Sequence, residues 1–333
     1  MIRKVHLFLI AGIAFLGLLG TGACGGDDSV SGGKKRLKIA GVFLQEDQFF
    51  RLIQFGMRDA ADQAGAELLL ASSDSKLDKE IQLVNTYIAR QVDAIVLSPL
   101  SKTASVTALT RARDAGIKVI TYNSTVEGGV PVSFIESDQS NLGAQTGRVA
   151  RSYIEERLGG NAKIAILAFK SLLAEQSDAR TGGFKSEISN LPGAEIVAEQ
   201  DAWLPEIAIK KVGDILTANP EVNLIWSANE GGTVGAVMAV KSAGQEGRIA
   251  VFGTDVSDQL AGFLLSDDQI LHATTGQRPF EIGSKAVETA VDAINEEPVK
   301  NRVSMSGVLL NRLDPAAVRT FRKRLQELIA KGS

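Results

Sequence analysis

From Arg36 onward, two kinds of segment alternate along the chain. Short apolar runs, typical of buried parallel strands, alternate with longer segments whose apolar residues recur every three or four positions. The run at residues 224–228 stops at the polar, glycine-rich sequence Asn229-Glu230-Gly231-Gly232, where a helical pattern begins. We therefore expect a buried strand whose carboxyl end carries Asn229 and Glu230 to the start of a helix.

The same pattern predicts strands and helices in alternation along the whole chain. The predicted strands are 39–44, 68–71, 93–97, 119–122, 131–135, 163–168, 195–198, 224–228, 249–252, 270–275 and 303–310. The predicted helices are 50–64, 78–90, 103–115, 142–158, 178–190, 206–216, 233–240, 259–265, 278–294 and 314–331. This order implies parallel sheets with helices on both faces. Two successive windings of similar size predict two lobes, with the boundary near Ser137-Asp138.

Polar residues follow five of the predicted strands. They are Gln45-Glu46-Asp47, Ser98-Pro99, Asn123-Ser124, Asn229-Glu230 and Gly253-Thr254-Asp255. In open α/β sheets, ligands bind in the crevice outside the carboxyl ends of the strands. We therefore expect these residues to line one cleft that holds a small polyhydroxylated solute.

Composition excludes several classes of function. The 333 residues carry a formal net charge of −3, so there is no basic field for nucleic acid. Cys24 is the only cysteine, which excludes an internal disulfide and a thiolate metal cluster. The two histidines, His6 and His272, lie far apart in the sequence. We expect neither a metal nor a cofactor.

An enzyme is not expected either. The sequence has no Walker phosphate loop, no Gly-x-Gly-x-x-Gly after the first strand and no Gly-x-Ser-x-Gly elbow. Asp138 and Asp255 could form a glycosidase carboxylate pair. The doubled winding and the leader described next argue against that interpretation.

The first residues have the composition of an export signal. Arg3 and Lys4 precede the apolar run 5–19, which is shorter than the about 20 residues of a membrane span. We expect a signal peptide over residues 1–23 and a lipidated, flexible tether over 24–36. The sequence Thr21-Gly22-Ala23-Cys24 resembles the lipobox of bacterial lipoproteins, which implies lipidation of Cys24, although leucine is usual where Thr21 stands. The alternative is ordinary cleavage with an incidental cysteine.

Several segments together carry a family resemblance. They are 39–50, 93–99, 119–123, Ser137-Asp138, Arg180-Thr181-Gly182-Gly183-Phe184, Asn229, Phe252-Gly253-Thr254-Asp255 and Gln277. In this order and spacing they resemble the periplasmic sugar-binding proteins of the ribose-binding type. Those proteins are substrate-binding components of ABC importers, and their fold is shared with the effector domains of lactose-repressor-like regulators. The resemblance covers residues 37–310.

The resemblance implies the type I periplasmic binding protein fold. This is an α/β fold of two Rossmann-like lobes, joined by three crossovers, that closes on its ligand like a hinged trap. The crossovers fall near residues 136–138, 275–278 and 305–308. The N-terminal lobe would comprise 37–137 plus 278–306, and the C-terminal lobe 138–277 plus 307–333.

The family's ligand-binding positions map onto ten residues of this chain. They are Asp47, Phe49, Phe50, Asn123, Asp138, Arg180, Trp203, Asn229, Asp255 and Gln277. Such side chains suit a sugar, because hydroxyls both donate and accept hydrogen bonds and the C–H faces of the ring pack on aromatic rings. The family usually has an Asp-Arg pair at Asn123-Ser124 and a small polar residue at Phe43. These departures leave open a pentose, a hexose, a furanose or a cyclitol.

Several of these side chains also have a structural interpretation. Asp47 and Asp255 would each cap the helix that follows, and at least one of the two phenylalanines would lie in the core. The remaining alternatives are a surface ion pair of Arg180 with Asp178 or Glu175, a hydrophobic role for Trp203, and a helix N-terminal charge at Glu230.

The resemblance implies an exported solute receptor rather than an enzyme. It would capture a sugar or polyol and deliver it to an ABC permease and its ATPase, as a monomer held at a membrane through lipid on Cys24. It would act in the periplasm or at the cell surface and would not bind nucleic acid. The alternative function is a sensory one, in which a membrane receptor or sensor kinase recognises the closed form. The sequence decides neither between these two nor which sugar is bound.

Overall fold

The computed structural model describes residues 36–331. The predicted leader, Cys24 and the tether up to residue 35 lie outside the described residues. None of the described helices is both long and apolar enough to cross a membrane.

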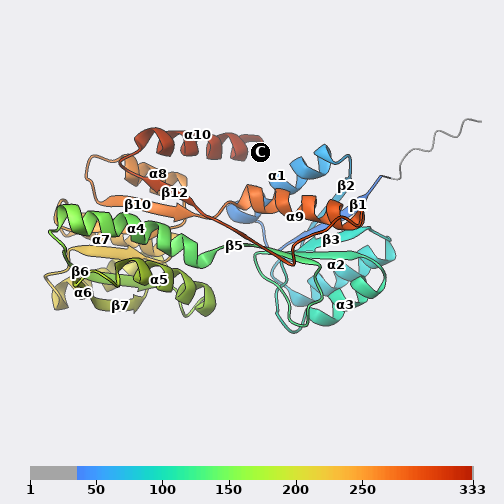
Figure 1. The fold of residues 1–333 in the computed structure, drawn as a ribbon, viewed down its shortest axis with the longest axis horizontal. Coiled ribbons are helices and arrows are strands. Elements are labelled where there is room, and N and C mark those ends of the chain that lie inside the picture. The colour runs from blue at the N-terminus through green and yellow to red at the C-terminus, as the bar shows by residue number, and fades with distance from the viewer. Residues whose placement is uncertain (1–35, 332–333) are drawn as a thin grey trace, which may run out of the picture. The chain divides into compact units, whose positions relative to one another are not determined.

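Six strands form the first sheet, in the order β11-β5-β4-β3-β1-β2. Their bounds are β1 Lys38–Phe43, β2 Glu67–Ser72, β3 Ala94–Leu97, β4 Lys118–Tyr122, β5 Ser133–Ser137 and β11 Arg302–Met305. All neighbouring pairs in this sheet are parallel. The helices that pack with it are α1 Gln48–Gln63, α2 Leu77–Ala89, α3 Val106–Asp114 and α9 Pro279–Ile294. We call this sheet with its helices the first lobe (Figure 1).

Six strands also form the second sheet, in the order β12-β10-β9-β8-β6-β7. Their bounds are β6 Asn161–Ala168, β7 Gly193–Asp201, β8 Leu224–Ser227, β9 Ala250–Thr254, β10 Leu271–Gly276 and β12 Val308–Asn311. Only β12 is antiparallel to its neighbour. The helices are α4 Gln139–Arg157, α5 Ala174–Ile188, α6 Pro205–Ala218, α7 Glu230–Ser242, α8 Asp258–Leu265 and α10 Pro315–Lys331. We call this sheet with its helices the second lobe (Figure 1).

The central strands of each sheet are buried on both faces because their side chains are apolar on both faces. In β1, Ile39 packs with α1 and α9, whereas Ala40 and Val42 pack with α2 and α3. In β8, Ile225 belongs to the core under α6, α7 and α10, and Trp226 to the core under α4 and α5. This explains why the predicted strands are continuous apolar runs rather than alternating ones.

The two sheets have the same strand order when β1–β5 are matched with β6–β10, and β11 with β12. In both, the helix after the fifth strand belongs to the other lobe. The helix after β5, α4, packs against α5, and the helix after β10, α9, packs against α1. Each lobe therefore contains one helix exchanged with the other half of the chain.

Three crossovers join the lobes, as predicted. The chain crosses between β5 and α4, between β10 and α9, and between β11 and β12. The crossovers are also bonded to one another. The Ser137 hydroxyl donates to Oε1 of Gln277 at 2.8 Å, and the backbone N–H of Asp138 donates to the carbonyl of Met305 at 2.9 Å.

Glycines allow the exchanged helices to approach their partners closely. A Cβ on Gly143 of α4 would lie 1.8 Å from the carbonyl oxygen of Arg180 on α5, and a Cβ on Gly283 of α9 would lie 2.0 Å from that of Ile53 on α1. Neither position has room for a larger residue. The helix that carries Arg180 is thus fixed by backbone-to-backbone contact.

The predicted elements are present, with three notable differences in their bounds. The predicted strand 303–310 is two strands, β11 and β12, which belong to different sheets. The predicted helix 103–115 begins only at Val106, since residues 101–105 form turns bonded to the Ser101 and Ser105 hydroxyls. The predicted helix 178–190 begins earlier, at Ala174, so Arg180 lies in its second turn rather than at its start.

Candidate ligand-binding cleft

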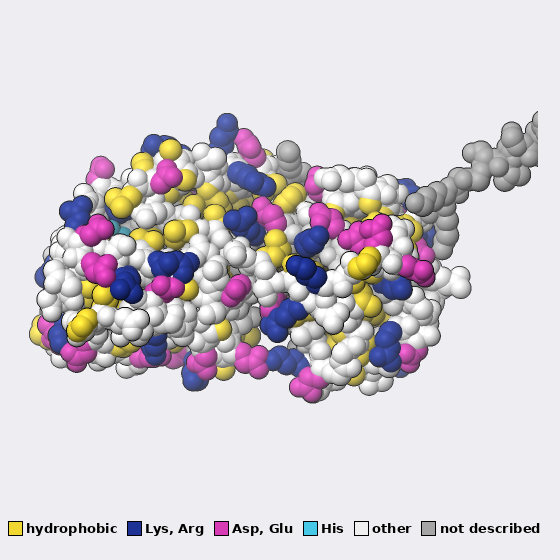
Figure 2. Space-filling view, in the orientation of Figure 1, with side chains coloured by type: hydrophobic (Ala, Val, Ile, Leu, Met, Phe, Trp, Pro, Cys, Tyr) yellow, Lys and Arg dark blue, Asp and Glu magenta, His cyan; other side chains and the backbone are white. Residues whose placement is uncertain are grey.

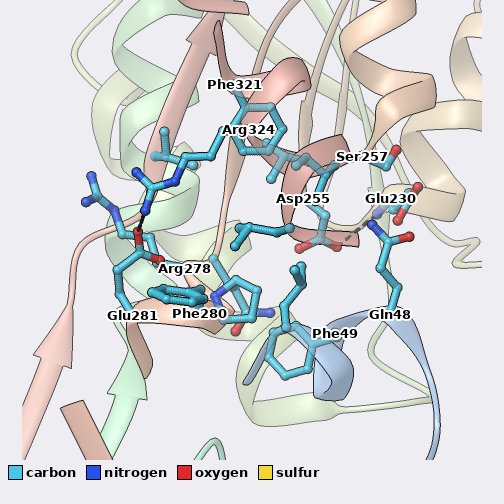
Figure 3. A pocket seen from close by; sticks show the side chains of 17 residues that line it. Gln48, Phe49, Glu230, Asp255, Ser257, Arg278, Phe280, Glu281, Phe321 and Arg324 are labelled. Carbon is cyan, nitrogen blue, oxygen red and sulfur yellow. Dashed lines mark hydrogen bonds and ion pairs between the residues drawn. The ribbon is translucent and has the colours of Figure 1, made fainter. Parts of the chain in front are cut away.

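A cavity of about 450 Å³ lies at the carboxyl ends of the strands, lined by side chains from both lobes. Its polar lining residues are Gln48, Glu230, Asp255, Ser257, Gln277, Arg278, Glu281 and Arg324 (Figure 3). On the face of the molecule shown in Figure 2, acidic and basic side chains are interspersed over both lobes. Among residues 36–331, no group of three or more His, Cys, Asp or Glu side chains is arranged to hold a metal ion.

Asp255 lines this cavity and is fixed by two partners. Its Oδ1 accepts from Nη1 of Arg180 at 3.2 Å, and its Oδ2 accepts from the backbone N–H of Glu230 at 3.0 Å. It does not cap the helix that follows it, because Ser257 caps α8. Its backbone has φ of 72°, in the left-handed region that aspartate tolerates better than most residues. Asp255 is thus held at the strand end by α5 and α7.

Arg180 is 3% exposed and lies behind Asp255. Nε donates to Oε1 of Gln139 at 2.8 Å, and Nη1 donates to the carbonyl of Ala228 at 2.9 Å. The guanidinium also lies over the Phe169 ring, 5.2 Å from its centroid. The surface alternative for Arg180 is wrong: among the described residues Asp178 pairs with Lys170 and Glu175 with Lys102.

The adjacent phenylalanines after β1 have different environments. The Phe49 ring lines the cavity (Figure 3), whereas Phe50 is 5% exposed and belongs to the core of the first lobe. The two rings meet edge to face at 5.3 Å. Phe49 is therefore the ring available to a ligand, and Phe50 positions it.

Three predicted ligand residues are used as helix caps. Asp47 caps α1 by accepting from Phe50 N–H, Asp138 caps α4 by accepting from Asn141 N–H, and Asn229 caps α7 by accepting from Gly232 N–H. The Asn229 amide also donates to the carbonyl of Trp203 at 2.9 Å. None of them lines the cavity. Their ligand roles stay predictions; in this structure each of them bonds to backbone groups, and Asp47 also accepts from the Gln45 amide at 2.6 Å.

The remaining predicted residues lie in several places. Gln277 lines the cavity at the second crossover. Asn123 follows β4 with φ of 60°, at the position in the first sheet that corresponds to Asp255 in the second. Trp203 is half-buried beside the core under α4 and α5 and does not line the cavity. The structure therefore brings Phe49, Asp255 and Gln277 together at the cavity, with Arg180 behind Asp255.

Several cavity residues were not predicted from the sequence. Gln48 and Ser257 follow predicted strands, so the rule that strand ends line the cleft could have found them. Glu230 was predicted as a helix N-terminal charge; it does begin α7, but it also faces the cavity. Nothing in the sequence indicates that Phe280 and Phe321 line the cavity, because aromatic residues in amphipathic helices normally belong to the core.

The Glu230 carboxyl is the perturbed acid of the cavity. Burial raises its pKa above the ordinary value of 4.5, a hydrogen bond with Ser257 lowers it, and the neighbouring Asp255 carboxylate raises it again. The net direction is upward. Both of these carboxyl groups, two glutamines and the Phe49 ring thus line the cavity, and the buried Arg180 guanidinium lies behind Asp255. Such an arrangement accepts and donates hydrogen bonds to neutral hydroxyls.

Two lobes, three crossovers and a cleft at the strand ends define a type I periplasmic binding protein. The periplasmic binding protein domain family matches residues 42–298, and the chain belongs to that family.

The family match agrees with similarity to individual proteins. The chain is 30% identical over 271 residues to the ABC transporter periplasmic-binding protein YphF of Escherichia coli, covering 79% of this chain and 82% of that protein. It is 30% identical over 263 residues to the ribose import binding protein RbsB of Escherichia coli, covering 78% and 85%. A periplasmic solute-binding protein of an ABC transporter from Actinobacillus succinogenes, solved with bound D-allose, superposes with a TM-score of 0.73 at 25% identity, covering 85% of this chain and 100% of that one.

Proposed function

We propose that this chain is the solute-binding component of a carbohydrate ABC importer and has no enzymatic activity. It captures one sugar or polyol between its lobes and presents the closed form to a permease and its ATPase. The observation that carries the proposal is the Asp255 carboxylate, which lines the cavity and is held by the buried Arg180. The family and the sugar-importing relatives support it.

Closure follows from contacts to both lobes. A ligand that contacts both Phe49 of the first lobe and Asp255 of the second binds the closed form of the protein more tightly than the open form, in which the lobes are apart. Ring C–H groups would pack on Phe49, while hydroxyls would bond to Asp255 and Gln277. We include Asp47, Asn123, Asp138, Arg180, Trp203 and Asn229 in the proposed site as residues that reach the ligand on closure or support those that do.

We further propose that the protein is exported and lipidated on Cys24, and acts as a monomer at a membrane surface. The sequence of residues 1–24 supports this proposal. Metabolic labelling with a radioactive fatty acid, compared between the natural chain and Cys24→Ser, tests it. Label that persists in the Cys24→Ser protein would contradict lipidation at this residue.

Thermal melts against a panel of pentoses, hexoses, furanosides, inositols and nucleosides test the main proposal. A ligand at about 100-fold excess over its dissociation constant stabilises the native form by roughly 2.7 kcal/mol, which raises the melting temperature clearly. A shift with one sugar or cyclitol is the expected result. A flat panel with a well-folded protein would contradict a sugar receptor and favour a sensory role with another ligand.

A further inference from the structure

The cavity has two chemically different regions. In Figure 3, Asp255, Glu230 and Gln48 lie at one end, while Glu281 and Arg278 lie at the other, with the Phe280 ring beside them. Part of the cavity lining is an apolar wall. It is formed by Phe280 of α9, Val308 of β12, and Phe321, Leu325 and Leu328 of α10.

The residues of this wall lie just after the second crossover, just after the third crossover and in the C-terminal helix α10. None of its residues is among those predicted to bind a sugar, and none carries a side-chain hydrogen-bonding group. A hydroxyl buried against such a wall would lose its water without gaining a partner, at a cost of roughly 1–3 kcal/mol. The hydroxyls of a sugar therefore gain no hydrogen bond from this part of the cavity.

The volume of the cavity is compatible with a ligand larger than one sugar ring. At about 450 Å³, the cavity lies within the range of about 300–1,000 Å³ typical of sites for drug-sized ligands. The far end is bounded by an ion pair between Arg324 of α10 and Glu281 of α9, 3.4 Å apart. In Figure 3, Asp255 lies at one end of the cavity and this ion pair at the other, so a sugar ring at Asp255 leaves the rest of the cavity to a substituent.

We propose that the cleft takes a glycoside rather than a free monosaccharide. The sugar ring binds at the end formed by Asp255, Glu230 and Gln277, and an alkyl or aryl aglycone packs along the wall formed by Phe280, Phe321 and Leu328. This inference rests on the proposed function and adds the class of substrate. Burial of the aglycone's apolar surface against this wall contributes favourable binding free energy, whereas the hydroxyls of the sugar ring find no partners there.

Isothermal titration of the full-length chain with matched ligands tests the inference. For D-glucose, D-galactose, D-ribose and L-arabinose, the free sugar is compared with its methyl and its phenyl glycoside. For at least one sugar, the phenyl glycoside should bind at least tenfold more tightly than the methyl glycoside. Equal affinities for the free sugar, the methyl glycoside and the phenyl glycoside would overturn the inference and leave the proposed function standing.

Two variants locate the aglycone. Leu328→Trp, which fills the wall from a half-buried position, should abolish the preference for the phenyl glycoside over the methyl glycoside. Phe321→Ala should reduce the same preference. Arg319→Ala, exposed on the same helix and outside the cavity, is the control and should change nothing.

The outcomes separate the two proposals. Weaker binding of free sugar by Leu328→Trp, in a variant that melts like the natural chain, would place the ring at the wall and overturn the arrangement. Absence of binding by every free sugar and every glycoside would overturn this inference and the proposed function together. If Phe321→Ala fails to fold, Leu328→Trp and the ligand series on the natural chain still decide.

Discussion

The Arg180 guanidinium and the Asp255 carboxylate form an ion pair, with Nη1 3.2 Å from Oδ1. Arg180 is 3% exposed and Asp255 is 25% exposed, so the cation is behind the anion and the anion faces the cavity. The other carboxylate oxygen is bonded to the start of α7. Asp255 is therefore oriented before any ligand arrives, which reduces the cost of ordering it on binding.

Removal of this carboxylate should weaken both the fold and the binding of sugar. Asp255→Ala leaves the buried guanidinium without its anion, although Gln139 and Ala228 still accept from it. We expect a loss of about 2–3 kcal/mol in the free energy of unfolding, measured by urea denaturation, and a parallel loss of ligand affinity by titration. Asp178→Ala, which removes an exposed partner of Lys170, is the control and should stay within about 0.5 kcal/mol. Equal stability of the two variants would contradict the structural role of Asp255.

Close packing of α4 on α5 should make Gly143 intolerant of a side chain. A Cβ there would lie 1.8 Å from the Arg180 carbonyl oxygen, so Gly143→Ala must move the helix that carries Arg180. We expect at least about 1–3 kcal/mol of destabilisation in urea denaturation and weaker ligand binding.

Gly182 provides the matched comparison on the same helix pair. Gly182 lies inside α5, and apart from its chain neighbours and the backbone of its own helix no atom lies within 4 Å of a Cβ built there. Gly182→Ala should therefore stabilise the protein by up to about 1 kcal/mol. If both alanine variants are neutral, the helices are not held by the contact that the structure shows.

Glu230 should make stability depend on pH. Because its pKa is raised above 4.5 in the folded protein, the folded state binds a proton more tightly than the unfolded chain does. Its contribution to stability is therefore fully present below pH 4.5 and is lost as the pH rises through the folded pKa. Glu230→Gln removes this loss. The variant's stability relative to the natural chain should rise between pH 4.5 and pH 7, measured by urea denaturation at both pH values, whereas a constant difference would refute the raised pKa.

An ion pair also links the two lobes. Nζ of Lys102, in the loop before α3, lies 2.5 Å from Oε2 of Glu175 at the start of α5, and both side chains are exposed. Lys102→Ala should weaken ligand binding no more than about fivefold, because exposed pairs contribute little. The effect should appear in titrations at about 20 mM salt and vanish at about 500 mM. Lys170→Ala, whose pair with Asp178 lies within the second lobe, should show no such salt dependence.

Most of the fold could be predicted from the sequence because the central strands of each sheet are apolar and buried, and the helices between them have apolar residues on one side. The failure at residues 303–310 has a specific cause. The apolar run continues across Ser306-Gly307, whereas β11 pairs with β5 and β12 pairs with β10 in another sheet. The strands that β11 and β12 pair with are far away in the sequence, so the residues of the run itself do not indicate that it changes sheets. Only the family resemblance predicted a crossover there.

The site was predictable to the extent that strand ends converge. Asp255 reaches the cavity because it follows a central strand, and Phe49 because it begins a helix after one. Asn229 also follows a central strand, yet its amide is occupied by Gly232 and Trp203. An asparagine between a strand and a helix has the same sequence signature whether it caps the helix or binds a ligand. The wall formed by α10 required the tertiary structure, since nothing near residues 315–331 resembles the family's ligand-binding positions.

The exchange of α4 and α9 between the lobes has a consequence for the order of folding. The core of the first lobe includes Ile282, Ala286 and Val287 of α9, so it is incomplete until the chain has been made to about residue 294. The second lobe needs α4, which precedes all of its own strands, and its core can close as synthesis proceeds apart from β12 and α10. Domains usually fold from the N-terminus first during synthesis. Here the core of the N-terminal lobe is completed only when α9 has been made, after all the helices of the second lobe except α10.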